Sequence, residues 1–251
     1  MNRSRVRASA SRHSFLFPPA ARRREDAGRT LEIMRESFQI ELDQLADDLA
    51  RMTRLAAQMI TNASNALHHA DLALAEMVIS ADDEMNALHD DVEQRCINLL
   101  ALQAPVAADL RVVVSVIHAV ADVERMGDLA QHIAKITRLK HPVVTVPGDV
   151  RPVFARMGLL ATELAEAAAE AVEKRDPLGG ARLSAADDEV DALRRRLFQI
   201  LFDKTWVHGV EPAVDVALIG RYYERFADHA VAIARQVGYR VTGQLPVKHH
   251  A

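Results

Sequence analysis

The sequence predicts an all-α protein built from two tandem, related three-helix bundles. Its 251 residues are 49% hydrophobic but only 4% aromatic, with 10 glycines and 9 prolines, a composition typical of helical bundles. Residues 124–128 read Glu-Arg-Met-Gly-Asp, and residues 224–228 read Glu-Arg-Phe-Ala-Asp. A second match pairs residues 81–88 with residues 186–193. A repeat of about one hundred residues indicates tandem domains rather than a solenoid.

The first 33 residues differ from the rest of the chain. They are rich in arginine, contain Pro18 and Pro19, and show no hydrophobic periodicity. Such a segment buries too little apolar surface to offset the entropy lost on ordering. We therefore expect residues 1–33 to be a disordered extension, or to result from a translation start placed upstream of a true start at Met34. Residues 244–251 are expected to form a short tail.

The first domain is predicted to span residues 34–141 and to begin with two long helices. Apolar residues recur at spacings of three and four from Phe38 to Ala66, which predicts a helix ending near His69. The carboxylate of Asp71 can cap the next helix, whose apolar stripe extends for about seven turns. Both stripes are expected to face the core of a bundle.

A break in the pattern precedes the third helix. Pro105 ends the second stripe and suits the first turn of a helix that continues to the repeated acids. His141 and Pro142 mark its end, and residues 142–149, which contain proline and glycine, predict a linker between the domains.

The second domain, residues 150–243, repeats this plan. Apolar spacing predicts three further helices, separated by turns that contain proline or glycine. They are expected at about residues 153–171, 183–201 and 213–241. Helices of thirty-odd residues would be about 50 Å long at about 1.5 Å per residue, so three in each domain make an elongated bundle.

Composition and motifs argue against several classes of function. The net charge of -4 and the pI near 6.3 give no electrostatic reason to expect nucleic-acid binding. No run of eighteen apolar residues is present, so a soluble protein is expected. The single cysteine, Cys96, cannot form an internal disulfide, which favours a reducing compartment. Neither a Gly-rich phosphate loop nor a nucleophile with a paired base is found, which argues against an enzyme.

The repeated acids predict two groups of carboxylates beside the cores. Residues four apart on a helix are neighbours, so the two acids of each repeated motif form a pair on one face. The matched segments at residues 81–88 and 186–193 place a facing pair on the preceding helix, although the first domain has Asn86 as the second member of its pair. The predicted acids are Asp82, Glu124 and Asp128 in the first domain, and Asp187, Asp191, Glu224 and Asp228 in the second.

Carboxylates grouped near a core repel one another, and a positive group must compensate them. One interpretation is a divalent or trivalent metal ion bound by oxygen ligands, such as Fe, Mg or Mn, with Zn an option if His132 or His229 joins. The alternative is a metal-free helical adaptor, in which Arg125, Arg225 and neighbouring arginines neutralise the acids. A ferritin-like di-iron enzyme would need Glu-x-x-His motifs, and the sequence contains none.

These motifs make the sequence similar to the PhoU family. The resemblance rests on residues 102–111, 122–128 and 223–230, and it extends over about residues 35–243. It implies two three-helix bundles whose Glu/Asp-x-x-x-Asp motifs can bind metal, with the seven acids given above as the ligands. An acid is commoner in this family at the position of Asn86, so the first domain departs from the family pattern.

The resemblance also implies a function. PhoU-like proteins act in the cytoplasm between a phosphate-importing ABC transporter and a membrane histidine kinase. They restrain the phosphate-starvation response and phosphate uptake when phosphate is plentiful. We therefore expect a cytoplasmic, homodimeric, non-enzymatic regulator that binds the transporter ATPase and the kinase, and that reaches the membrane only through these partners. Long amphipathic helices suit such docking.

Overall fold

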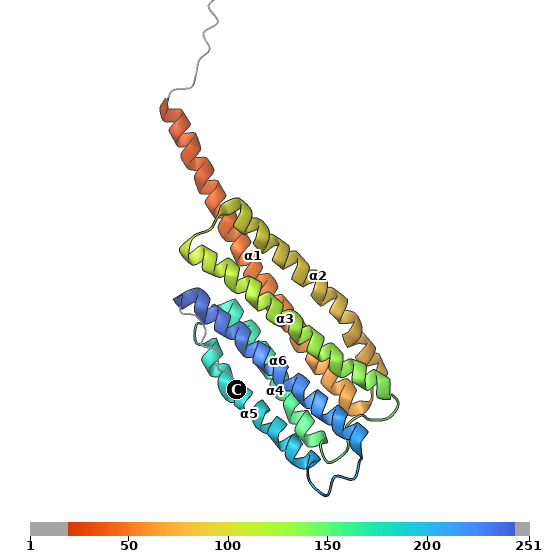
Figure 1. The fold of residues 1–251 in the computed structure, drawn as a ribbon. Helices are drawn as coiled ribbons and strands as arrows, with labels where there is room; N and C mark the ends of the chain where they lie inside the picture. Colours follow the sequence, from red (N-terminus) through yellow and green to blue (C-terminus); the bar gives the residue numbers. More distant parts are fainter. Residues whose placement is uncertain (1–19, 244–251) are drawn as a thin grey trace, which may run out of the picture. The chain divides into compact units, whose positions relative to one another are not determined.

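The computed structural model describes residues 20–243, and residues 1–19 and 244–251 lie outside the described part. This part contains six α-helices and no strands, which confirms the predicted all-α fold. The helices are α1 (Ala20–His69), α2 (Leu72–Gln103), α3 (Ala107–Lys140), α4 (Arg151–Lys174), α5 (Gly179–Leu201) and α6 (Val210–Thr242) (Figure 1). None of these described helices is both long and apolar enough to cross a lipid bilayer.

The first helix begins earlier than the sequence predicts. α1 starts at Ala20, so the stretch from there to residue 33, which was expected to be disordered, is helical. Arginine, alanine and glutamate have high helix propensities, and this local preference outweighs the missing apolar stripe. The chain up to Ile40 and the chain from Glu41 onward are separate structural units. Because the second unit contains helices from both repeats, the predicted domain and linker boundaries stay a prediction.

The ends of the helices follow local rules, with one correction to the prediction. Asp71 caps α2 as predicted, and its side chain accepts a hydrogen bond from the backbone N–H of Leu74 at 3.0 Å. Pro105 does not lie in the first turn of α3, which begins two residues later. Ala104, the residue before this proline, adopts a left-handed conformation that ends α2. Proline disfavours the right-handed helical region at the preceding residue, so α2 does not continue through Ala104. Pro212, in contrast, lies in the first turn of α6, where its missing N–H has no cost.

The two repeats join through their third helices. α2 packs against α3 in the first repeat, and α4, α5 and α6 pack together in the second. α3 and α6 then lie side by side between the repeats (Figure 1). They are antiparallel, because Lys140 at the end of α3 pairs with Glu211 at the start of α6, while Asp122 pairs with His229 further along. Because α3 and α6 hold equivalent places in the two repeats, the two ends of this antiparallel α3–α6 seam correspond to each other.

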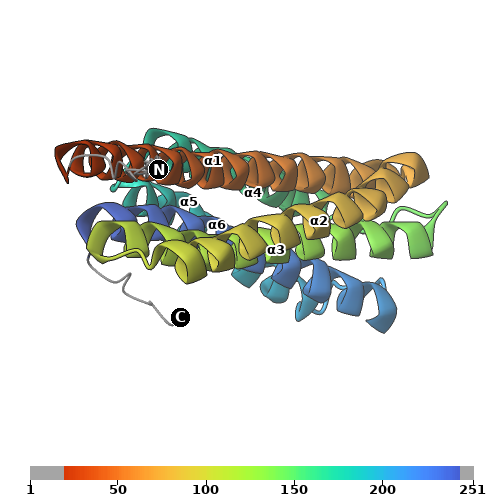
Figure 2. The same ribbon diagram turned by 90° about the horizontal axis from the view of Figure 1, so that it is seen from above.

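A second contact between the repeats is made by α1 and α4. The part of α1 after Ile40 runs beside α4 (Figure 2). Thr61 and Thr162 share a hydrogen bond of 2.9 Å across these helices. Ser64 on α1 shares one of 2.7 Å with Tyr223 on α6, whose side chain is fully buried. The two predicted bundles are therefore joined along much of their length.

Many of the buried side chains belong to the predicted apolar stripes, such as Leu45, Met52 and Met59 in α1. Methionines are prominent among the largest of them, and their flexible side chains fill irregular gaps between helices. The largest fully buried side chains are Leu45, Met52, Met59, Ile60, Leu67, Met85, Met126, Ile133, Phe154, Met157, Tyr223 and Phe226.

Candidate metal centres

The seven predicted acids lie in two groups, one in each repeat, as the sequence predicts. Within each group the carboxylates are close enough to influence one another's pKa. The first group comprises Asp82 on α2 with Glu124 and Asp128 on α3, and the second comprises Asp187 and Asp191 on α5 with Glu224 and Asp228 on α6.

Glycines bring the paired helices together beside both groups. Gly127 lies inside the first repeated motif, and a Cβ at this position would stand 3.1 Å from Cγ of Met85 on α2. Gly220 lies one turn before the second motif, and a Cβ there would stand 2.9 Å from Cδ1 of Leu197 on α5. The missing side chains therefore let α3 approach α2, and α6 approach α5, next to the acids.

Asp82 lies deeper than the core border at which the sequence places it, with only 8% of its surface exposed. Its Oδ2 accepts hydrogen bonds from Gln131 at 2.8 Å and from Asn86 at 3.3 Å. Its Oδ1 is buried and has no hydrogen-bond partner among the described residues. Burial raises the pKa of Asp82, and the charge of Asp128 raises it further, whereas Lys135 acts in the opposite direction.

The two motif acids of the first group share one arginine. Arg125 donates from Nη1 to Oδ2 of Asp128 at 2.9 Å, and its Nε lies 3.5 Å from Oε2 of Glu124. Burial raises the pKa of Glu124, and repulsion by Asp128 adds to this effect. Because the Arg125 side chain is 58% exposed, each of these ion pairs contributes about 1 kcal/mol or less.

Glu224 in the second group is buried and compensated by two arginines. Nε of Arg194 lies 3.0 Å from Oε2 of Glu224, and Nη1 of Arg221 lies 2.5 Å from the same oxygen. Arg194 also donates from Nη1 to Oε1 at 3.3 Å. This arrangement is the one that the metal-free interpretation predicts, with Arg194 and Arg221 in the role suggested for Arg225.

The other three acids of the second group are less well compensated than Glu224: the charge of Arg235 acts on Asp187, and that of Arg221 acts on Asp228. Among the described residues, Asp187, Asp191 and Asp228 form no ion pair with a basic side chain. Burial raises the pKa of Asp187 to about 6, with further contributions from the charges of Asp228 and Asp191. Removal of surrounding water also raises the pKa of Asp228, and Glu224 and Asp191 add repulsion. The second group therefore holds excess negative charge at neutral pH.

The two histidines considered as extra ligands point elsewhere. His229 places Nδ1 2.9 Å from Oδ1 of Asp122, across the α3–α6 seam. The ring of His132 lies 5.4 Å from that of Tyr222, across the same seam, and its Nδ1 lies 2.6 Å from the backbone oxygen of Asp128. Both imidazoles therefore help to join the repeats instead of completing an acid group.

The acids as positioned do not fit a metal ion. Across the part of the chain that the structure describes, no group of three or more His, Cys, Asp or Glu side chains is arranged to hold one. The carboxylates of each group interact through their charges, but their oxygens do not converge on a common point with metal-ligand geometry. Binding of a metal would require these side chains to rearrange.

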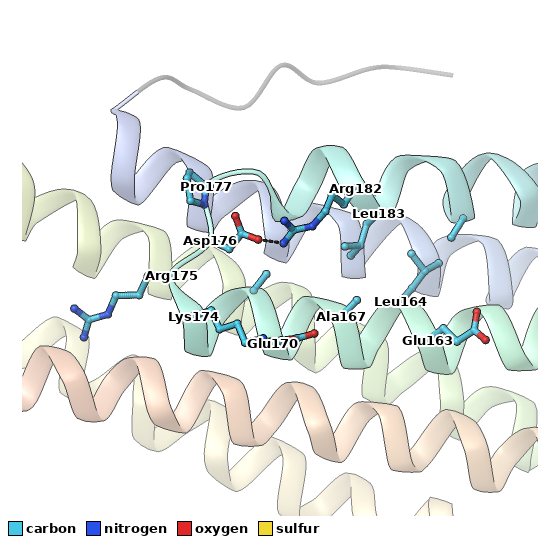
Figure 3. A pocket seen from close by; sticks show the side chains of 12 residues that line it. Glu163, Leu164, Ala167, Glu170, Lys174, Arg175, Asp176, Pro177, Arg182 and Leu183 are labelled. Carbon is cyan, nitrogen blue, oxygen red and sulfur yellow. Dashed lines mark hydrogen bonds and ion pairs between the residues drawn. The ribbon is translucent and has the colours of Figure 1, made fainter.

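A groove lies next to the second acid group, and Ala186, which directly precedes Asp187, is one of its lining residues. This groove of about 820 Å³ runs between the end of α4 and the start of α5 (Figure 3). Leu164 and Leu183 give it an apolar surface, and the ion pair between Asp176 and Arg182 borders it. None of the seven predicted ligands lines this groove.

Three residues that complete the acid groups were not predicted. Gln131 bonds to Asp82, and Arg194 and Arg221 pair with Glu224. A signal for Arg221 exists in the sequence, because it precedes Glu224 by three residues and so lies on the same helical face. Arg194 lies on another helix, and only the register between α5 and α6 reveals its role.

Comparison with known families gives a consistent result for both repeats. The chain matches the PhoU domain twice, at residues 49–137 and 154–237. Each match lies within one of the two repeats found in the sequence.

Several relatives align over most of this chain. Phosphate-specific transport system accessory protein PhoU homolog 2 of Mycobacterium tuberculosis is 47% identical over 213 residues, which cover 85% of this chain and 100% of the relative. PhoU homolog 1 of Mycobacterium leprae is 46% identical, over 85% of this chain and 96% of the relative. The PhoU homolog of Synechocystis is 32% identical, over 84% and 93%.

Two solved structures share the fold. The crystal structure of PhoU from Pseudomonas aeruginosa superposes with a TM-score of 0.74 at 26% identity, over 82% of this chain and 100% of that one. The phosphate transport system regulatory protein PhoU from Streptococcus pneumoniae gives a TM-score of 0.74 at 25% identity, over 84% and 100%.

Proposed function

Because the chain belongs to the PhoU family, we propose that it is a regulatory accessory protein of a phosphate-specific transport system. The observation that carries the proposal is the PhoU domain in both repeats, together with 47% identity to a relative whose whole length is covered. That relative is named as an accessory protein of phosphate-specific transport. The proposed role needs docking surfaces and no catalytic centre.

We propose further that the protein couples a high-affinity phosphate ABC transporter to a sensor histidine kinase in the cytoplasm. In this role it represses the phosphate-starvation response and phosphate uptake when phosphate is plentiful. Exposed apolar side chains support a docking function, because such side chains often mark protein interaction sites. Each repeat carries them at the turn between its second and third helices: Leu102 and Val106 in the first, and Phe202 and Val207 in the second.

The regulatory proposal is tested in a strain that lacks the gene. A reporter for phosphate-starvation genes should be switched on in phosphate-rich medium, and a copy encoding the full chain should restore repression. Mycobacterium tuberculosis has relatives named homolog 1 and homolog 2, so any second family member must also be deleted. Normal repression in a strain without any family member would refute the regulatory role.

The structure favours the metal-free adaptor as a second interpretation, because Glu224 is already compensated by two arginines. No step of the proposed regulation passes through a metal ion. Elemental analysis of purified protein separates the two interpretations. If metal is bound, the double variant Asp187→Asn with Glu224→Gln should lose metal from the second group and remain folded. If arginines neutralise the acids instead, the purified wild-type protein should contain no stoichiometric Fe, Zn, Mg or Mn.

A further inference from the structure

The two ends of the α3–α6 seam occupy equivalent positions in the repeats. At one end, Lys140 in the last turn of α3 lies between two acids near the start of α6. It forms ion pairs with Glu211 and, at 3.0 Å, with Asp215. The cation at this end of the seam is therefore neutralised by the protein itself.

The opposite end keeps the cation but lacks the acids. The repeat relates residue 124 to residue 224, and the same offset relates Lys140 to Arg240, Glu211 to Arg111 and Asp215 to Ser115. A second arginine and a hydroxyl group thus stand where the first end has two carboxylates. The cation Lys140 is thus neutralised by acids at one end of the seam, whereas the equivalent cation Arg240 has no such acids at the other end.

The three side chains at this end lie close to one another. Ser115 and Arg240 both line a small cavity in the seam, together with Gln236. Arg111 precedes Ser115 by four residues on α3 and so lies on the same face. Arg111 also reaches the end of α6, because its Nε lies 3.6 Å from the position that a Cβ of Gly243 would take.

Polar atoms at this end lack partners. Ser115 is only 4% exposed, and neither its Oγ nor the buried Nε of Arg111 has a hydrogen-bond partner among the described residues. Within the same residues, no carboxylate forms an ion pair with Arg111 or Arg240. Asp43, the acid that acts on Arg240, is paired with Arg175.

These partnerless groups have an energetic consequence. Burial lowers the pKa of the Arg240 guanidinium, and the positive charge of Arg175 lowers it further. Buried donors and charges without partners destabilise a fold, so a bound anion that satisfies them would stabilise it.

We propose that Arg111, Ser115 and Arg240 form a binding site for a small tetrahedral oxyanion, inorganic phosphate, at this end of the α3–α6 seam. Guanidinium groups bind phosphate oxygens through two parallel hydrogen bonds. Hydrogen phosphate carries a hydroxyl group at neutral pH that sulfate lacks. The Ser115 hydroxyl and the Gln236 amide oxygen can accept a hydrogen bond from it, directly or through a water in the cavity. The cavity of about 10 Å³ is lined mainly by apolar side chains and has room for one water, so the anion does not enter it. The anion binds beside the cavity, against the half-buried arginines.

The choice of phosphate among oxyanions rests on the proposed function, whereas the existence of an anion site does not. Isothermal titration of the full-length protein with inorganic phosphate, at constant ionic strength, tests both. Saturable binding is expected, and Arg111→Gln or Arg240→Gln should each weaken it by roughly tenfold or more. The matched control is Lys140→Gln at the equivalent end of the seam, which should leave phosphate affinity unchanged.

A charge-restoring variant gives a second, independent readout. Arg111→Glu with Ser115→Asp copies the acids of the other end, so Arg240 should gain carboxylate partners as Lys140 has. This variant should melt at a higher temperature than the wild-type protein without phosphate, and phosphate should no longer raise its melting temperature. Circular dichroism of each variant confirms that the helices are retained.

Three results would overturn the proposal. Absence of saturable phosphate binding by the folded wild-type protein removes the site. Equal stabilisation by phosphate, sulfate and chloride, unchanged in Arg240→Gln, indicates a general salt effect only. Tighter binding of adenosine monophosphate than of phosphate assigns the site to a larger phosphorylated molecule. None of these results bears on the regulatory role, which the deletion strain tests separately.

Discussion

Individual acids in the second group have opposite electrostatic environments although they share one cluster. Glu224 forms ion pairs with Arg194 and Arg221, whereas Asp187 has no ion pair and is influenced more by neighbouring carboxylates than by Arg235. Ionised Asp187 is therefore disfavoured in the folded protein, whereas the Glu224 carboxylate has two basic partners. The two residues allow this contrast to be measured in one protein.

Replacement of Glu224 by glutamine should destabilise the fold, because it leaves two guanidinium charges without a partner. The Glu224 side chain is 12% exposed but those of Arg194 and Arg221 are 32% and 47% exposed, so solvent screens part of the loss. We expect a decrease of about 1 to 3 kcal/mol in the free energy of unfolding, between the values for exposed and buried pairs. Urea unfolding followed by circular dichroism measures it.

The control for this variant is Glu189→Gln. Glu189 accepts two hydrogen bonds from Arg156, at 2.7 and 2.9 Å, but both side chains are more than 40% exposed. Loss of this pair should change the free energy of unfolding by about 1 kcal/mol or less. Equal effects of the two glutamine variants would show that the burial of Glu224 has no influence.

Asp187 should make stability depend on pH. Its pKa rises from 3.8 in the unfolded chain to about 6 in the folded protein, so the native state binds the proton more tightly. The free energy of unfolding should therefore fall as pH rises from about 4 to about 6, and then level off. Asp187→Asn should remove only the part of this decline that Asp187 causes, which we expect to be about 1 to 2 kcal/mol after solvent screening. The raised pKa values of Asp82, Glu124 and Asp228 should leave a decline of the same sign. Parallel stability curves for the two proteins between pH 4 and pH 7 would contradict the assignment.

The sequence predicts which acids gather, but it does not predict what neutralises them. Helical spacing predicts the face on which Glu224 lies. Its partner Arg194 lies on another helix, so their contact depends on the register between α5 and α6. The depth of Asp82 was underestimated for a similar reason. An apolar stripe predicts the buried face of a helix only to within about one residue. Asp82 lies inside this margin, and a hydrogen bond from Gln131 on α3 stabilises its buried position.

At the scale of helices, α6 packs closely against the start of α5 at Gly180, which has no side chain. A Cβ at Gly180 would stand 2.7 Å from Cγ of Arg235 and 3.1 Å from its backbone nitrogen. A flexible side chain can move aside, but the backbone of α6 cannot move without shifting the helix. The distance between the start of α5 and the end of α6 therefore depends on this glycine.

Gly180→Ala should lower the free energy of unfolding by up to about 2 kcal/mol. Alanine is the better helix former by about 1 kcal/mol, but forcing a methyl group against backbone atoms costs about 1 to 3 kcal/mol. The control is Gly148→Ala, because a Cβ at Gly148 would meet no atom within 4 Å. Thermal melts of both variants measure the difference, and a stabilised Gly180→Ala protein would show that α5 shifts freely.

The errors in the predicted helices also have local causes. The missing apolar stripe predicts disorder before Met34, whereas α1 begins at Ala20, where arginine, alanine and glutamate favour a helix. Pro105 was assigned to a first helical turn because proline is favoured there. The effect of this proline on Ala104 separates α2 from α3 by three residues instead.

At the scale of the molecule, the sequence predicts two bundles but not how they join. Internal repeats reveal equivalent helices, whereas the contacts between repeats are made by side chains that differ from one repeat to the other. Asp122 with His229, and Ser64 with Tyr223, are such unlike pairs. A periodic pattern identifies a buried face, but it does not distinguish a face that is buried within one repeat from a face that is buried against the other.

The joined repeats should not be separable into stable halves. Residues 34–149 and residues 150–251, produced alone, would each expose the surfaces that α3 and α6 bury against each other, including the side chain of Tyr223. Exposing buried apolar surface to water costs about 25 cal/mol of free energy per Å². We therefore expect each half to aggregate or to lose helicity. Produced together, the halves should form a one-to-one complex with the helicity of the full chain. Size-exclusion chromatography with light scattering and circular dichroism measure both results.

In the deletion strain, neither half alone should restore repression, whereas both together should. A monomeric, cooperatively unfolding fragment 34–149 that restores repression by itself would refute this requirement and would make the first repeat an independent regulator.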